Sequence, residues 1–276
     1  MSVADASAPT RTGPSVHALL RTLGWIGLGL IAVAVSLSDF LASAPASATG
    51  VGPLLSPPAN AFRFGTDILG RDMLSETLHG LSATVRSALP ATMVALIAGA
   101  LFGFIAARLP RAVAVLLHGT ISILASVPAL LLATLIIGLT SRDFAALAAG
   151  LAVAPYAFTR AFERAEQQAR AAHSEYARAT GISPATLLRR DLVYEFSDTL
   201  LSSAARSLAA VSIVLSTVSF LGFGAVPPHR DLGLMIAAAK PYFLHAWWTA
   251  AFPALALTVL ILFARLAAGL DEGERA

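Results

Sequence analysis

The sequence predicts an all-α, polytopic membrane protein with about six transmembrane helices. Of its 276 residues, 57% are hydrophobic and 13% are charged, whereas soluble domains carry about a quarter charged residues. The mean hydropathy is +0.74, which indicates that most of the chain lies in lipid. Apolar segments that approach the length needed to cross a bilayer core, about 20 residues, recur along the chain.

The predicted spans are six apolar segments, which run over Leu23–Phe40, Leu89–Ala107, Ala112–Leu139, Phe144–Phe162, Leu208–Val226 and Trp247–Leu266. The third segment is long for one span and contains Pro128, so a kink or a tilt is expected there. The run "ASAPASA" after the first segment resembles a signal-peptide cleavage site. The apolar core of that segment is longer than the ~7–15 residues of a signal peptide, which favours an uncleaved first helix.

Basic residues predict the orientation, because cytoplasmic loops carry an excess of Arg and Lys. With a cytoplasmic N-terminus and six alternating helices, 13 of the 19 basic residues fall inside and 6 fall outside. We therefore expect both termini in the cytoplasm, with tails over residues 1–22 and 271–276 and a transmembrane domain over residues 23–270. A cytoplasmic loop then runs from about residue 163 to 206. The net charge of +3 fits such loops and gives no reason to expect a nucleic-acid partner.

This loop is predicted to contain a helix, a glycine turn and a second helix. The stretch "FTRAFERAEQQARAAHSEYARAT" is rich in good helix formers, and Gly181 offers a helix C-terminus. Ser183 can cap the second helix, with Pro184 at its first position. The second helix is amphipathic in "ATLLRRDLVYEF", which indicates that it packs on its own membrane domain or on a partner. A solvated connector is the alternative interpretation.

The sequence lacks the motifs of common catalytic and nucleotide-binding sites. No Walker A loop is present, since Lys240, the only lysine, does not follow a Gly-rich run. Neither H-E-x-x-H nor G-x-S-x-G occurs. The absence of cysteine excludes disulfides and thiolate metal sites. We therefore expect no catalytic residue and no metal ligand on this chain.

Several stretches between about residues 62 and 270 resemble, in the order of the family, the dipeptide/oligopeptide/nickel permease family of ABC transporters. The pattern E-x-A-x-x-x-G, formed by Glu175, Ala177 and Gly181, resembles the coupling loop of these permeases. "FGTDILGRDMLSETLHG" resembles the family signature after the first helix, and "ILASVPALLLA" its third-helix pattern. "SFLGFGAVPPHRDLGLMI" and the following "WWTAAFPALAL" resemble the end of the fifth helix and the start of the sixth. The chain departs from the family in having "LVYE" where a proline is common, so the second loop helix is expected to run straighter into helix five.

The resemblance implies a type I ABC importer permease fold with a cytoplasmic coupling helix, in the inner membrane of a bacterium. The implied partners are two ABC ATPase subunits, a sister permease in a heterodimer, and an extracytoplasmic substrate-binding protein. The chain would carry no cofactor, because ATP and Mg²⁺ bind the ATPases. The implied substrates are di- and oligopeptides, with nickel or a metal chelate as the alternative. A stand-alone secondary transporter or a membrane enzyme is disfavoured, because the spans lack clustered ionisable residues.

The resemblance also implies two sets of site residues. The residues expected to dock the ATPase are Glu175, Tyr176, Ala177, Arg178, Gly181, Arg189 and Arg190. The residues expected at the extracytoplasmic mouth are Gly65, Thr66, Asp67, Gly70, Arg71, Asp72, Gly222, Gly224, Pro227 and Pro228. Two interpretations of residues 64–80 stay open: a short surface helix that meets the binding protein, or a cap in which Asp67, Arg71 and Asp72 pair among themselves. The two prolines are expected to end helix five.

Overall fold

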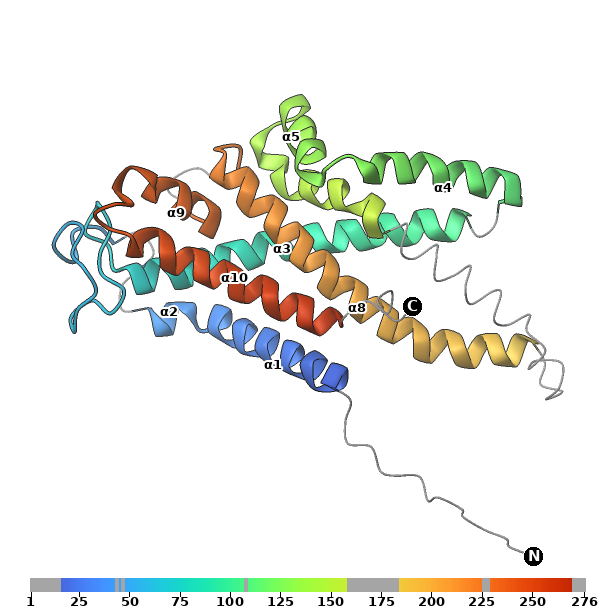
Figure 1. Cartoon of the computed structure of the whole chain (residues 1–276), viewed down its shortest axis with the longest axis horizontal. Helices are drawn as coiled ribbons and strands as arrows, with labels where there is room; N and C mark the ends of the chain where they lie inside the picture. Colours follow the sequence, from blue (N-terminus) through green and yellow to red (C-terminus); the bar gives the residue numbers. More distant parts are fainter. Residues whose placement is uncertain are drawn as a thin grey trace, which may run out of the picture.

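The computed structural model describes residues 16–42, 45, 48–106, 109–157, 184–224 and 229–269, and it is built from helices (Figure 1). The elements are α1 (Val16–Ser36), α2 (Ser38–Leu41), α3 (Met73–Ala106), α4 (Arg111–Ser126), α5 (Ala129–Leu139), η1 (Arg142–Phe144), a helix over Ala145–Ala157, α8 (Pro184–Phe220), α9 (Leu232–Ala239), η2 (Lys240–Tyr242) and α10 (Trp248–Ala268). Within the described ranges the only β-pairing is an isolated bridge between Thr66 and Asp72. The all-α fold class is therefore confirmed.

Within the described residues, four helical segments are long and apolar enough to cross a membrane: α1, Met73–Gly99 of α3, Leu201–Phe220 of α8, and α10. Helices α4 and α5 form a fifth candidate that is bent by 89° at Pro128, so the predicted kink is confirmed. The helix over Ala145–Ala157 is shorter, and the rest of the predicted fourth span lies outside the described residues. The chain is thus a multi-pass membrane protein, and the count of six spans stays a prediction.

Several predicted helix boundaries were wrong. Helix α1 runs over Val16–Ser36 instead of Leu23–Phe40, so it begins within the stretch predicted as the N-terminal tail. Helix α3 begins at Met73 instead of Leu89, because the amphipathic stretch before Leu89 continues the transmembrane helix instead of forming a separate surface helix. Helix α8 ends at Phe220 instead of Val226, and Gly222 follows in the left-handed region at φ 87°. A break at Phe220 therefore ends this helix before Pro227 and Pro228, which lie outside the described residues.

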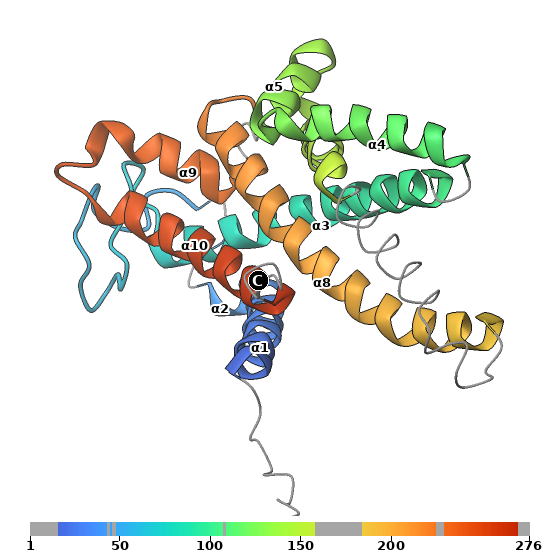
Figure 2. The same cartoon turned by 45° about the vertical axis from the view of Figure 1, so that its right-hand side comes forward.

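Helix α8 is a single helix from Pro184 to Phe220, so the second loop helix does run straight into the fifth predicted span. Its 37 residues extend over about 55 Å at 1.5 Å per residue, whereas a bilayer core is about 30 Å thick. The N-terminal half of α8 reaches beyond the adjacent ends of α1 and α10 in both views (Figures 1 and 2). Helix α8 is therefore about 25 Å longer than a bilayer core is thick.

Helices α1 and α10 pack antiparallel at very short range. A Cβ on Gly24 would lie 2.1 Å from the backbone nitrogen of Ala267, so this crossing requires a residue without a side chain. Gly27 lies against the ring of Phe263 in the same way. The N-terminal end of α1 and the C-terminal end of α10 consequently lie at the same end of the bundle. Retention of α1 in the mature protein stays a prediction.

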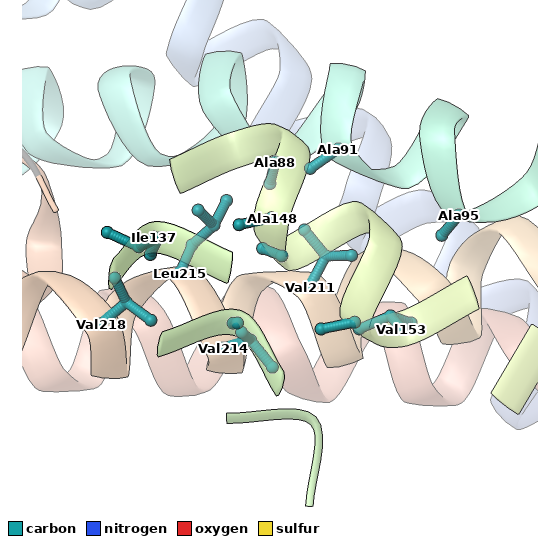
Figure 3. Packing of buried hydrophobic residues seen from close by; sticks show 13 residues of the cluster. Ala88, Ala91, Ala95, Ile137, Ala148, Val153, Val211, Val214, Leu215 and Val218 are labelled. Carbon is teal, nitrogen blue, oxygen red and sulfur yellow. The ribbon is translucent and has the colours of Figure 1, made fainter. Parts of the chain in front are cut away.

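Small residues also dominate the packing between α3, α8 and the helix over Ala145–Ala157 (Figure 3). The alanines of this cluster lie on α3, on α5 and on the Ala145–Ala157 helix, and the branched side chains lie mainly on α8. The residues labelled in Figure 3 are Ala88, Ala91, Ala95, Ile137, Ala148, Val153, Val211, Val214, Leu215 and Val218. Without a hydrophobic driving force in lipid, such close van der Waals contact holds membrane helices together.

Candidate functional site

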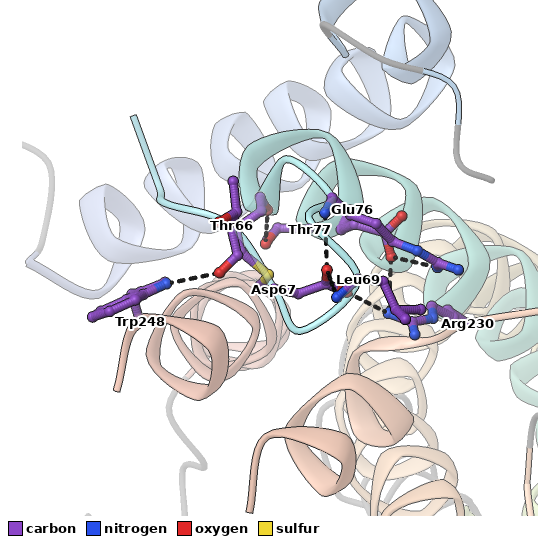
Figure 4. Close-up of polar contacts among 9 residues, drawn as sticks. Thr66, Asp67, Leu69, Glu76, Thr77, Arg230 and Trp248 are labelled. Atoms are coloured by element: carbon purple, nitrogen blue, oxygen red, sulfur yellow. Dashed lines mark hydrogen bonds and ion pairs between the residues drawn. The ribbon is translucent and has the colours of Figure 1, made fainter. Parts of the chain in front are cut away.

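A polar cluster lies at the end of the bundle where α3 and α10 begin (Figure 4). It consists of Thr66, Asp67, Arg71, Asp72, Glu76 and Arg230. The loop that precedes α3 supplies its first four members, α3 supplies Glu76, and the segment after α8 supplies Arg230. The polar cluster therefore joins parts of the chain that hydropathy alone assigns to separate loops.

The loop before α3 folds around the carboxylate of Asp67. Its Oδ1 accepts hydrogen bonds from the backbone N–H groups of Leu69, at 2.7 Å, and of Arg71, at 2.9 Å. Gly65 and Gly70 stand in the left-handed region, at φ 73° and 67°. A Cβ on Gly70 would lie 2.4 Å from the carbonyl oxygen of Gly52, so both the conformation and the space require glycine. The local sequence thus specifies a tight, internally bonded loop.

Asp72 caps the N-terminus of α3. Its Oδ2 accepts hydrogen bonds from the backbone N–H of Ser75, at 3.1 Å, and from the hydroxyl of the same serine, at 2.7 Å. A carboxylate at this position satisfies free N–H groups and interacts favourably with the helix dipole. The cap explains why the helix begins here, ahead of the strongly apolar residues.

Arg230 connects the loop and α3 to the segment after α8. Its guanidinium lies 3.1 Å from the Glu76 carboxylate and 3.5 Å from that of Asp67. Arg71 also approaches Glu76, at 3.5 Å. The Glu76 side chain is 4% exposed, so its charge depends on these two guanidinium groups instead of on water.

Of the two interpretations of residues 64–80, the cap is closer to the structure, but the expected pairing was wrong. Asp67 and Arg71 each find their ion-pair partner elsewhere, in Arg230 and Glu76. The reason is that the Asp67 carboxylate is already held by backbone N–H groups of its own loop, and only its second oxygen faces a cation.

Trp248 fastens the loop to α10. Its indole N–H donates to the carbonyl oxygen of Thr66 at 3.1 Å, and the Thr66 hydroxyl in turn bonds to Pro53 and Ser56. The rings of Phe64 and Phe252 stack beside this contact, with their centroids 3.9 Å apart. The first turn of α10 and the loop before α3 therefore form one packed unit.

Replacing Trp248 with phenylalanine is expected to lower the free energy of unfolding by about 1–2 kcal/mol. The variant keeps most of the apolar contact but leaves the buried Thr66 carbonyl without its indole donor. Trp247→Phe is the matched control, because Trp247 is 53% exposed, and its expected effect is within about 0.5 kcal/mol. Thermal unfolding of the purified protein in detergent measures both. Equal midpoints for the two variants would contradict the role given to the indole.

Two of the remaining expected mouth residues, Gly222 and Gly224, directly follow α8. Gly222 forms the turn after α8, and Gly224 is packed so closely on Ser219 that a Cβ would lie 1.9 Å from the serine hydroxyl oxygen. Pro227 and Pro228 lie outside the described residues. Sequence reasoning missed Glu76 and Arg230 as cluster members and Trp248 as the residue that bonds to Thr66, although all three stand inside the quoted family stretches.

The residues expected to dock an ATPase are mostly outside the described ranges. Glu175, Tyr176, Ala177, Arg178 and Gly181 belong to this undescribed part. Arg189 and Arg190 lie on the backbone of α8, in the half that reaches beyond α1 and α10. Pro184 is the first helical residue of α8, as predicted. The structure therefore leaves the coupling role of these residues as a prediction.

Across the part of the chain that the structure describes, no group of three or more His, Cys, Asp or Glu side chains is arranged to hold a metal ion. The polar cluster itself balances two guanidinium groups against carboxylates that already accept hydrogen bonds and ion pairs. Its chemistry is that of a structural connection, not of a reactive centre.

The sequence of the chain is similar to that of a known family of membrane proteins. The profile of a family described as "Binding-protein-dependent transport system inner membrane component" matches residues 99–270. A putative peptide transport system permease protein of Brucella suis is 30% identical over 249 residues, which cover 87% of this chain and 81% of the relative.

Two further relatives are similar over most of their length. The di/tripeptide transport system permease protein DppC of Pseudomonas aeruginosa is 29% identical, over 76% of this chain and 72% of its own. The probable D,D-dipeptide transport system permease protein DdpC of Escherichia coli is 26% identical, over 83% of this chain and 77% of its own.

Proposed function

Because the chain belongs to the family of binding-protein-dependent transport system inner-membrane components, we propose that it is the permease subunit of an ATP-driven importer of di- and oligopeptides. The observation that carries the proposal is the similarity, over most of the chain, to three permeases named for peptide transport. These names favour peptides over nickel or a metal chelate. The chain acts as a transport subunit, and separate ATPase chains bind ATP and Mg²⁺ and hydrolyse the nucleotide.

The proposed assembly contains two ATPase subunits, a sister permease and an extracytoplasmic substrate-binding protein. The described surface supports a partner within the membrane or a covering of lipid, because several helices expose large apolar side chains. On α3, α4 and α5 these are Met93, Ile97, Leu101, Val115, Leu116, Ile123, Leu131, Leu135 and Leu139. A sister permease would cover part of this area, and lipid the rest.

Both chain ends are proposed to lie in the cytoplasm. The 13 to 6 distribution of basic residues supports this, as does the shared position of the α1 N-terminal end and the α10 C-terminal end. The polar cluster, at the other end of α10, would then face the extracytoplasmic side and the binding protein. It holds the loop before α3, the segment after α8 and α10 together, so that they move as one body when the permease changes state.

Two kinds of reporter can be fused after Ala276, one that is active only in the cytoplasm and one that is active only outside it. We expect the cytoplasmic reporter to be active and the other to be inactive. The reason is the excess of arginines that the proposed orientation places on that side. Paired fusions to a cytoplasmic and an extracytoplasmic reporter measure this directly, and fusions after Gly50 supply the opposite control. Activity of the extracytoplasmic reporter after Ala276 would contradict the proposed orientation.

The link to ATP is proposed to run through the loop between the fourth and fifth spans. The length of α8 supports this, because the helix is about 25 Å longer than a bilayer core is thick. Its N-terminal half follows that loop in the chain and can transmit a movement of the loop into the membrane. ATP binding to the ATPases would shift a two-state equilibrium of the permease through different contacts in each state.

Glu175→Arg is expected to weaken the association with the ATPase subunits at least about tenfold, because truncating a buried charge pair costs ~2–5 kcal/mol. Pull-down of the ATPases with the variant permease measures the association. Glu163→Arg, the same charge reversal in the same loop but outside the family pattern, is the control. If the Glu175 variant binds the ATPase subunits as tightly as the wild type does, Glu175 is an ordinary surface residue, because exposed ion pairs contribute only ~0–1 kcal/mol.

A further inference from the structure

A cavity of about 290 Å³, with both apolar and polar side chains in its lining, lies between α3, α8, η1 and the segment that leads into α9. Its size is close to the lower limit of about 300 Å³ for small-molecule pockets. Side chains with hydroxyl groups line it, namely Thr84, Ser87, Ser216 and Ser219. The ionisable side chains of its lining are Arg142, Asp143, His229 and Asp231. The cavity adjoins the polar cluster but shares no residue with it, because Arg230 and Glu76 do not line it.

Ser216 is a polar group without a partner in this cavity. Its side chain is 4% exposed, and its hydroxyl oxygen has no hydrogen-bond partner in the structure. A buried hydroxyl that makes no hydrogen bond costs free energy, and such groups are rare in native proteins. The lining therefore has hydrogen-bonding capacity that an occupant of the cavity can use.

Asp231 brings a negative charge to the same lining. Its Oδ1 accepts from the backbone N–H of Leu234 at 2.8 Å, which caps α9, and its Oδ2 accepts from the Ser219 hydroxyl. No cation within the described ranges lies within ion-pair distance of this carboxylate. Burial raises the pKa of the Asp231 carboxyl despite these hydrogen bonds, so its neighbours do not fully stabilise the ionised form.

The arrangement suits a positively charged hydrogen-bond donor. An ammonium group donates three hydrogen bonds and accepts none, and it would satisfy both the carboxylate and the orphaned hydroxyl. Arg142 lines the same cavity without pairing to Asp231, which leaves a guanidinium for a carboxylate of the occupant. A short peptide with free ends carries both charges.

We propose that this cavity is a transit site for the permeating peptide, in which Asp231 binds the peptide ammonium group and Ser216 accepts one of its hydrogen bonds. The proposal rests on the function proposed above and adds a binding site within the permease itself. Recognition of a free ammonium group would then be a property of this chain itself.

Asp231→Asn is the sharpest variant, because asparagine is as good a helix cap as aspartate. Its one oxygen can keep the bond from the Leu234 N–H, and its amide NH2 can then donate to the Ser219 hydroxyl in place of accepting from it. The substitution therefore removes the charge and keeps the local structure. Asp39→Asn is the control, since the Asp39 side chain is 88% exposed and lies outside the cavity. Unchanged thermal unfolding of both variants establishes that the fold is intact.

The test is equilibrium binding of radiolabelled dialanine to the complete membrane complex without the binding protein, measured with and without ATP and vanadate. Wild type is expected to bind in at least one of these states, and Asp231→Asn to bind about tenfold more weakly, the loss of one charge-assisted hydrogen bond. Ser216→Ala should weaken binding less, and Asp39→Asn not at all. N-acetyl-dialanine, which lacks the ammonium group, should compete poorly.

Equal binding by wild type and Asp231→Asn overturns the site, as does equal competition by the acetylated peptide. Absence of wild-type binding in both states, alongside ATP-driven uptake of dialanine by the same complex with its binding protein, overturns the site but leaves the importer intact. Absence of that uptake as well overturns the proposed function and this site with it.

Discussion

Replacing Arg230 with methionine is expected to lower the free energy of unfolding by about 3 kcal/mol. Removal of one partner from a buried ion pair typically costs ~3–5 kcal/mol, because a charge is left without compensation. Here Glu76, 4% exposed, and Asp67, 10% exposed, both lose their shared guanidinium. Glu76 retains Arg71 at 3.5 Å, which places the expected loss at the lower end of that range.

The control for this experiment is Arg63→Met. Arg63 is exposed, lies in the loop before α3 and forms no ion pair within the described residues, so its loss should cost less than about 0.5 kcal/mol. Denaturant titration of the detergent-solubilised protein measures both variants. Adding Glu76→Gln to Arg230→Met should recover part of the loss, because the orphaned carboxylate is then neutral. Indistinguishable stability of the two arginine variants would contradict the structural role of Arg230.

Replacing Gly181 with leucine is expected to abolish peptide uptake while membrane insertion stays normal. The preceding residues favour a helix, and the sequence predicts that this helix ends at Gly181. We expect Gly181 either to adopt a backbone conformation that residues with a Cβ rarely adopt, or to contact a neighbouring segment so closely that a Cβ would clash. A displaced turn would misplace the whole docking surface, so the effect should exceed that of a single charge reversal.

Gly138→Leu is the matched control, because Gly138 on α5 is exposed and nothing lies within 4 Å of the Cβ it would gain. Uptake by whole cells that express equal amounts of each permease measures the difference. Normal uptake by the Gly181 variant would remove this residue from the coupling argument, whereas loss of uptake in both variants would point to general damage.

Much of the fold could be predicted from local sequence. The start of α3 could not, because it depends on a helix cap that hydropathy does not detect. Long apolar runs identified the candidate spans, and Pro128 identified the bend, because both depend on nearby residues alone. The start of α3 was misplaced because polar residues before Leu89 suggested a surface segment, although they lie on a helix that the Asp72 cap had already begun. Hydropathy measures composition and cannot detect such a cap.

The contacts of the candidate site could be predicted from the sequence only in part. The glycines and Asp67 could be expected to make a turn, since Gly favours positive φ and Asp bonds to nearby backbone. The pairing of Arg230 with Glu76 spans 154 positions in the chain, and no local pattern specifies it. The same holds for Trp248, which reaches a carbonyl 182 positions away. These contacts follow only from the packing of α3, α8 and α10.

ATP-driven accumulation of dialanine in proteoliposomes tests the central claim most directly. The complex is reconstituted from this chain, its sister permease, the two ATPases and the binding protein, and uptake is followed with ATP supplied on the ATPase side. The account predicts accumulation above the external concentration, lost when ATP, the binding protein or this chain is omitted. Accumulation that needs only an ion gradient, or that persists without this chain, would contradict it.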